Sequence, residues 1–188
     1  MNYAKWLPVI ALGAVLTGCY PLSVQPFYTA KDLVYDPALV GVWKEDGSGS
    51  GVWTIRRGDA TSYEALFSDD EETHRYQFHI VQLGDARYLD IVPLEDEGMV
   101  QHIPAHSLHR VHISAATIDL EPLNIDYFDA LIKAGKIGFA QYVVVPLQQG
   151  VDNKIVLTGS TAEMQEFLLK HAGEKDLFGD REHYKRVR

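Results

Sequence analysis

The sequence predicts a mainly β domain, an antiparallel meander that forms a sheet or a barrel and carries two short helices. From residue 39 onward the apolar segments are short and are separated by turn residues, a spacing typical of antiparallel strands. Apolar and polar residues alternate within several segments, as around Tyr76, Phe78 and Ile80, so each such strand has one face in water. Two stretches, about 125–134 and 161–172, have the period of an amphipathic helix instead.

Turn residues set the order of the strands along the chain. The glycine-rich stretch 45–50 predicts a flexible hairpin connection, Gly84–Asp85 a tight turn, and 95–98 an acidic loop. The basic residues 181–188 predict either a tail or a last edge strand. The strands expected before that segment are residues 40–44, 51–56, 62–67, 75–83, 87–93, 100–113, 117–120, 139–147 and 154–158.

The two helices have recognisable ends. Asp126 can cap the first helix, and Gly135 is expected to end it. The second helix begins at Ser160, which forms a capping-box pattern with Glu163. Its expected apolar face is made by Met164, Phe167, Leu168 and His171.

Composition excludes some classes of function. The 188 residues are 46% hydrophobic and carry a formal net charge of −9, so a broad electrostatic grip on nucleic acid is not expected. The chain has no Gly-x-Ser-x-Gly, His-Glu-x-x-His or phosphate-cradling motif. We therefore expect a non-enzymatic protein without a cofactor.

The N-terminus has the pattern of a secretory leader. Lys5 precedes an apolar run over residues 6–16, which is too short for a helix that must cross roughly 30 Å of hydrocarbon. The run ends at Leu16-Thr17-Gly18-Cys19, and Cys19 is the single cysteine of the chain. Because an exported chain with one free thiol carries a reactive group, we expect Cys19 to be modified.

Leu16-Thr17-Gly18-Cys19 resembles the lipobox of bacterial lipoproteins. The resemblance implies cleavage after residue 18, acyl chains on Cys19 and hence a membrane-lipid partner. Tyr20 stands where inner-membrane lipoproteins usually have aspartate, which implies the outer membrane, facing the periplasm. Anchoring by two or three acyl chains requires no protein span. We expect a signal peptide over residues 1–18, a tether over 19–36 that packs in part, and a single domain over 37–188.

Two copies of a Gly-Val-Trp triplet stand at residues 41–43 and 51–53. The first resembles the Gly-x-Trp signature on the first strand of lipocalins, in which the tryptophan plugs the closed end of a barrel. That resemblance implies an interior able to hold one small apolar ligand, with Trp43 and Trp53 as candidate ligand-binding residues. Alternatively, both tryptophans are core residues of another β-sheet.

Four histidines, His102, His106, His109 and His112, are close enough in sequence to suggest a metal site. On a strand, however, His102, His106 and His112 share one face at separations of roughly 13 and 20 Å, too far apart to ligate one ion. His109 points to the other face. A polar outer face with one histidine whose hydrogen bonds are satisfied is the preferred interpretation, although a site could still form if a neighbouring strand contributed His79 or His74.

Three functional hypotheses remain. The first is a lipid-anchored, non-enzymatic module that binds a small apolar ligand inside the barrel. The second is a structural protein that binds another envelope protein through edge strands and its basic C-terminus. The third is a metal protein or hydrolase that uses the histidine segment. A cavity inside the barrel would favour the ligand-binding module, and a filled core would favour the structural protein. Histidines that converge on one point would favour the metal protein or hydrolase.

Overall fold

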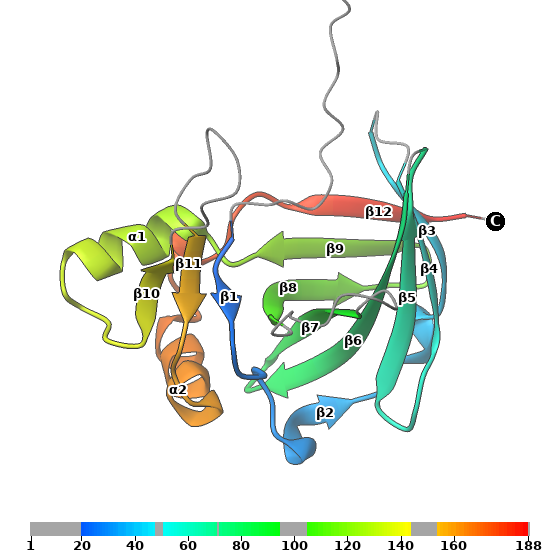
Figure 1. Cartoon of the computed structure of the whole chain (residues 1–188). Coiled ribbons are helices and arrows are strands. Elements are labelled where there is room, and N and C mark those ends of the chain that lie inside the picture. Colours follow the sequence, from blue (N-terminus) through cyan, green and yellow to red (C-terminus); the bar gives the residue numbers. More distant parts are fainter. Residues whose placement is uncertain (1–19, 48–50, 71, 95–104, 144–153, 188) are drawn as a thin grey trace, which may run out of the picture.

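Eight antiparallel strands close on themselves into a barrel, consistent with a lipocalin-like barrel (Figure 1). The computed structural model describes residues 20–47, 51–70, 72–94, 105–143 and 154–187. Around the barrel the strands follow the order β6-β5-β4-β3-β12-β9-β8-β7, and β7 pairs back with β6. The barrel strands are β3 (Gly41–Glu45), β4 (Val52–Arg57), β5 (Ser62–Ser68), β6 (Thr73–Leu83), β7 (Ala86–Leu94), β8 (Ser107–Ile113), β9 (Thr117–Pro122) and β12 (Glu182–Arg186).

The C-terminal segment is a strand, but it is not an edge strand. β12 pairs with β9 on one side, where Tyr184 faces Ile118, and with β3 on the other, where Tyr184 faces Glu45. The expectation of a tail or edge strand is therefore wrong. Closure satisfies the backbone groups of β12 on both sides, which an edge position would leave unpaired.

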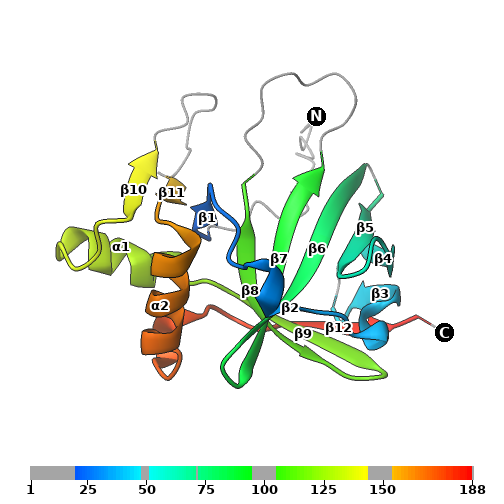
Figure 2. The same ribbon diagram turned by 90° about the horizontal axis from the view of Figure 1, so that it is seen from below.

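A second layer lies beside the barrel wall (Figure 2). It contains the helices α1 (Ile125–Lys133) and α2 (Thr161–His171) and a small sheet in the order β1-β11-β10. The strands of this sheet are β1 (Leu22–Ser23), β10 (Ala140–Val143) and β11 (Lys154–Leu157). All of these elements except β1 lie between β9 and β12 in the chain. The expectation of two short helices is confirmed, and none of the described helices is long and apolar enough to span a membrane.

The helix ends follow their sequence signals with one difference. Ser160 and Glu163 form the expected capping box of α2. The side chain that caps α1 is Asn124, which accepts a hydrogen bond from the amide of Asp126, so the expectation of Asp126 as the cap is wrong. Gly135 follows α1 with φ +62°, the left-handed conformation that glycine adopts without strain.

Residues 22–36, within the segment expected to be a tether, pack on the domain. β1 pairs with β11, and β2 (Leu33–Val34) pairs with β6. Phe27 is buried, and its amide donates a hydrogen bond to the buried Asp90 carboxylate at 3.2 Å. Burial of such aromatic residues removes apolar surface from water and outweighs the freedom of a solvated tether. The described part of this segment therefore belongs to the folded domain.

Two hydrophobic clusters form, one inside the barrel and one outside it. The inner cluster is centred on Trp43, Trp53 and Tyr63. The outer cluster joins Val81 and Leu83 of the barrel wall to the helices and the small sheet. Strand β6 therefore buries both Ile80 and Val81, which point to opposite faces of the wall.

One end of the barrel is closed by a cation stacked on an indole. The Arg186 guanidinium lies 4.1 Å from the centre of the Trp43 ring. It donates hydrogen bonds to the backbone carbonyls of Val40, Ala38 and Ala115 at 2.6–2.8 Å. A Cβ on Gly41 would lie 2.1 Å from Nη1 of Arg186, so the first Gly-Val-Trp triplet requires its glycine for this close approach.

We predict that Arg186→Met lowers the free energy of unfolding by about 2–4 kcal/mol, because it removes three charge-assisted hydrogen bonds and the cation–π contact. Urea denaturation followed by circular dichroism measures the loss. The neighbouring Lys185→Met breaks only an exposed ion pair with Asp46 and should cost less than about 1 kcal/mol. Equal losses in the two variants would contradict the role assigned to Arg186.

Candidate functional site

Side chains pack closely around the two tryptophans inside the barrel. Trp43 and Trp53 are cross-strand partners, and both are buried. Trp53 packs against the rings of Phe67, Tyr76 and Phe78 with centroid distances of 4.9–5.1 Å. The space that the described residues leave beside the two tryptophans has a volume of about 10 Å³, close to that of one water molecule. The structure therefore places the two candidate ligand-binding tryptophans in the hydrophobic core.

Toward the other end of the barrel, aromatic and polar side chains meet. The Tyr20 ring contacts His109 edge-on, with centroids 5.4 Å apart. Burial raises the pKa of the Tyr20 hydroxyl to about 12. Burial also raises the pKa of Glu182, although its carboxylate accepts a hydrogen bond from Tyr184.

The structure does not bring the four histidines of the sequence motif together. His106 lies on the outside of the barrel, where Nδ1 is 2.7 Å from a carboxylate oxygen of Asp90. His109 points into the interior, and His112 is exposed. His102 lies outside the described residues, as does the candidate lipidation site, Cys19. No group of three or more His, Cys, Asp or Glu in the described ranges could hold a metal ion.

His109 is buried without a hydrogen bond on either ring nitrogen within the described part of the chain. Burial lowers its pKa to about 4, so the folded protein keeps it neutral where the unfolded chain takes up a proton. The stability of the fold therefore decreases as the pH falls from the unfolded value of about 6.5 toward 4.

We predict that His109→Leu and His109→Gln both remove about 2 kcal/mol of the stability loss between pH 7 and pH 5. His109→Leu also raises stability at pH 7, because it removes two unpaired polar atoms from the interior. His109→Gln keeps a polar group in the interior and should not raise the stability at pH 7. Urea denaturation over this pH range measures both effects, and an unchanged pH profile in the two variants would contradict the assignment.

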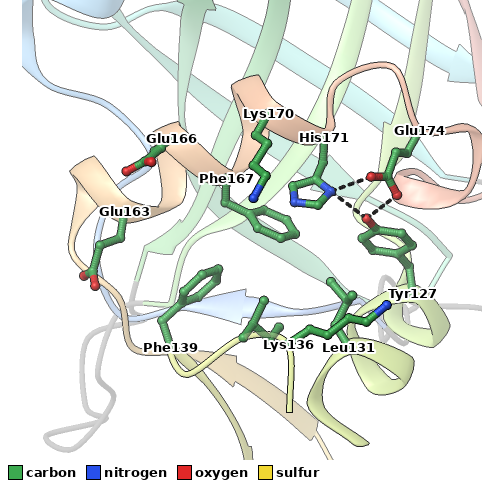
Figure 3. Close-up of a pocket in the computed structure, with 11 residues that line it drawn as sticks. Tyr127, Leu131, Lys136, Phe139, Glu163, Glu166, Phe167, Lys170, His171 and Glu174 are labelled. Carbon is green, nitrogen blue, oxygen red and sulfur yellow. Dashed lines mark hydrogen bonds and ion pairs between the residues drawn. The ribbon is translucent and has the colours of Figure 1, made fainter. Parts of the chain in front are cut away.

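A groove of about 670 Å³ lies outside the barrel (Figure 3). One wall is α2 and the residue Glu174 that follows it; the other is α1 and the residues between α1 and β10. The lining residues are Tyr127, Leu131, Lys136, Ile137, Phe139, Glu163, Glu166, Phe167, Lys170, His171 and Glu174. This volume is within the range of small-molecule sites.

Aromatic contacts build the apolar part of the groove. The Phe167 ring lies against Phe139 and Phe128, with centroids 5.4 Å from each. The imidazole of His171 stacks on the other side of Phe167 at 4.3 Å. Leu131 and Ile137 extend the apolar surface along the opposite wall.

A hydrogen-bonded cluster fixes one end of the groove. The Glu174 carboxylate accepts a hydrogen bond from the Tyr127 hydroxyl at 2.5 Å and lies 2.6 Å from Nδ1 of His171. Since a carboxylate only accepts, Nδ1 of His171 carries the proton in this pair. Hydrogen bonds from Tyr127 and then His171 lower the pKa of Glu174, while burial and the Glu174 bond raise that of Tyr127. The His171 ring is thereby held in one orientation (Figure 3).

Charged side chains are distributed unevenly over the groove. Figure 3 shows Glu163 and Glu166 at the end far from Tyr127, with their carboxylates directed outward. Lys170 directs its amine into the groove from α2, and Lys136 lies on the opposite wall. Neither lysine forms an ion pair with another described residue. The groove thus combines an aromatic floor with two ammonium groups that form no ion pair with a described residue, although the charge of Lys136 contributes to lowering the pKa of Glu174.

No pattern in the sequence indicated this groove. The helical period predicted His171 and Phe167 on the apolar face of α2, and both are partly or fully buried there. Tyr127 and Glu174 come from segments 47 residues apart, and no local motif relates them. Comparison of the chain with known protein families, with curated proteins and with solved structures gave no match.

We predict that Tyr127→Phe raises the pKa of Glu174 toward the ordinary value of a glutamate, because the variant removes the largest contribution that lowers it. An NMR titration of the side-chain carboxyl carbons measures this change. Glu163, whose pKa is lowered by Ser160 at the start of α2, is an internal control and should titrate as in the parent protein. A Glu174 midpoint that does not move would contradict the hydrogen-bond assignment.

Proposed function

We propose that the protein is a lipid-anchored lipoprotein of the outer membrane, facing the periplasm, which binds a small amphipathic molecule in the groove between α1 and α2. The function is binding rather than catalysis. The observation that carries the proposal is the contrast between the two cavities: about 10 Å³ beside the tryptophans in the barrel and about 670 Å³ in the groove. A ligand site requires the larger volume.

The chemistry of the groove supports a ligand with both apolar and polar parts. Phe139, Phe167, Leu131 and Ile137 offer apolar surface, while the lysines and the Tyr127–His171–Glu174 cluster offer polar contacts. Sites for small molecules usually have this combination of apolar walls and a few oriented polar groups. Catalysis has less support, because a histidine held by a carboxylate lacks a serine or cysteine nucleophile among the groove residues.

The two other hypotheses have less support from the described structure. The eight barrel strands are each paired on both sides, so among the described strands unpaired edges are left only at the two-residue strand β2 and in the small sheet. The separation of His106, His109 and His112 gives no site for a metal ion. Anchoring through Cys19 rests on the lipobox resemblance and on Tyr20 at the following position.

For the anchor, we predict that Cys19→Ser moves the protein from the membrane fraction to the soluble fraction and removes the mass of the acyl chains. Cell fractionation and mass spectrometry of the intact protein measure the two changes. Ser23→Ala, a substitution close to the anchor that leaves the thiol in place, should stay in the membrane fraction. If the Cys19→Ser variant stays in the membrane fraction and loses no acyl mass relative to the parent protein, the proposed lipid anchor is wrong.

For the groove, we predict that octanol, a neutral amphiphile, shifts the NMR signals of residues that line it. Ile137→Asp should weaken this binding by about tenfold or more, because it places a carboxylate on the apolar wall. Leu169→Asp is the matched control, since Leu169 is 53% exposed on α2 and does not line the groove. Equal binding by Ile137→Asp and Leu169→Asp would contradict the site.

A further inference from the structure

We infer that the ligand of the groove is an anionic single-chain amphiphile, a carboxylate on an alkyl chain, whose head lies between Lys136 and Lys170 and whose chain lies on Phe139 and Phe167. This inference rests on the proposed function and adds the charge of the ligand and its orientation.

Two lysine ammonium groups line the groove. Lys170 approaches from α2 and Lys136 from the segment after α1, so they belong to opposite walls of the groove. Some exposed lysines of the protein have acidic partners: Lys133 pairs with Asp129 and Lys185 with Asp46. Lys136 and Lys170 form no such ion pair with another described residue; Lys136 interacts with Glu174 only through its charge, so an anion entering the groove would not have to displace a bound carboxylate.

The carboxylates that line the groove either have hydrogen-bond partners of their own or point outward. Glu174 lies at the Tyr127 end of the groove (Figure 3), and the Tyr127 hydroxyl and His171 Nδ1 already occupy its oxygens. Glu163 is held by the amide and the hydroxyl of Ser160 at the start of α2. Glu166 points away from the groove. These arrangements leave the lysines as the charged groups with free hydrogen-bonding capacity toward a ligand.

An apolar surface lies beside the lysines. The stacked rings of His171 and Phe167 lie beside Lys170, and Phe139 packs edge-on against Phe167. An alkyl chain laid on this surface leaves water, while its charged head stays within reach of the ammonium groups. A purely polar ligand would leave the aromatic floor exposed. The arrangement therefore fits an anionic head attached to one chain.

The orientation follows from the charges at the two ends. Glu163 and Glu166 lie at the far end and disfavour an anion there, whereas Lys136 and Lys170 favour it at theirs. Reversing the ligand would place its carboxylate next to carboxylates. The groove is thus polarised along its length, and the head group has one preferred position.

The test compares three probes with the same eight-carbon chain: octanoate, octanol and octylammonium. The full chain carrying Cys19→Ser is used, so that acyl chains and detergent do not interfere, and binding is followed by NMR. We expect octanoate to bind about three- to tenfold more tightly than octanol, the size of a charge-assisted hydrogen bond in a partly exposed site. Octylammonium should bind more weakly than octanol.

The variants assign this preference to the lysines. Lys136→Gln and Lys170→Gln should each reduce octanoate affinity toward that of octanol and leave octanol binding within about twofold. Glu166→Gln, on the same helix, is the matched control and should preserve or slightly raise octanoate affinity. Raising the salt concentration from about 0.05 M to about 0.5 M should weaken the binding of octanoate and leave the binding of octanol unchanged.

Two kinds of contrary result are distinguishable. If octanol binds in the groove but octanoate binds no better, or if the lysine variants keep the preference, the inference about charge is wrong and the groove remains a binding site. If no probe shifts the signals of the groove residues, the proposed function is wrong as well. A preference for octylammonium that depends on Glu166 would assign the opposite ligand charge.

Discussion

The contact between Arg186 and Trp43 is the interaction on which the architecture depends. It joins the last strand, β12, to the first barrel strand, β3, and its hydrogen bonds also reach the β8–β9 turn at Ala115. With β12 in place, the sheet has no open edge, and the inward side chains of all eight strands meet in one core. The packing that closes the barrel therefore also brings the inward side chains together. Around Trp43 and Trp53 these side chains occupy the space that a ligand would need.

The position of the groove follows from how the chain returns to the barrel. Between β9 and β12 it forms α1, β10, β11 and α2, which cannot enter the closed barrel and bury their apolar faces on its outer wall. The two helices pack on this wall through Phe128, Met164 and Leu168, while Leu131 and His171 face each other across a gap. The residues that fold this layer onto the wall thus leave an open site between its two helices.

Local patterns in the sequence were sufficient for the two helices and for most of the barrel strands, because alternation and capping depend on neighbours within a few residues. They did not indicate the short strands β1 and β2, which lie in the segment expected to be a tether. The alternation around Tyr76, Phe78 and Ile80 and the capping box at Ser160 correspond to β6 and α2. Features that depend on distant partners were not predictable. Residues 181–188 gave no sign that Tyr184 pairs with Ile118 and Glu45, and nothing near Glu174 indicated Tyr127 as its donor. The two tryptophans fitted both a ligand site and a core until the packing around Trp53 was known.

The central claim is that ligands bind outside the barrel and not within it. Trp43 and Trp53 lie inside the barrel and away from the groove, so their indole N–H signals report on the interior alone. The most direct measurement compares the amide and indole NMR spectra of the protein with and without octanoate. The account predicts shifts in α1 and α2 with both indole signals unchanged. Shifted indole signals with unchanged helices would contradict it.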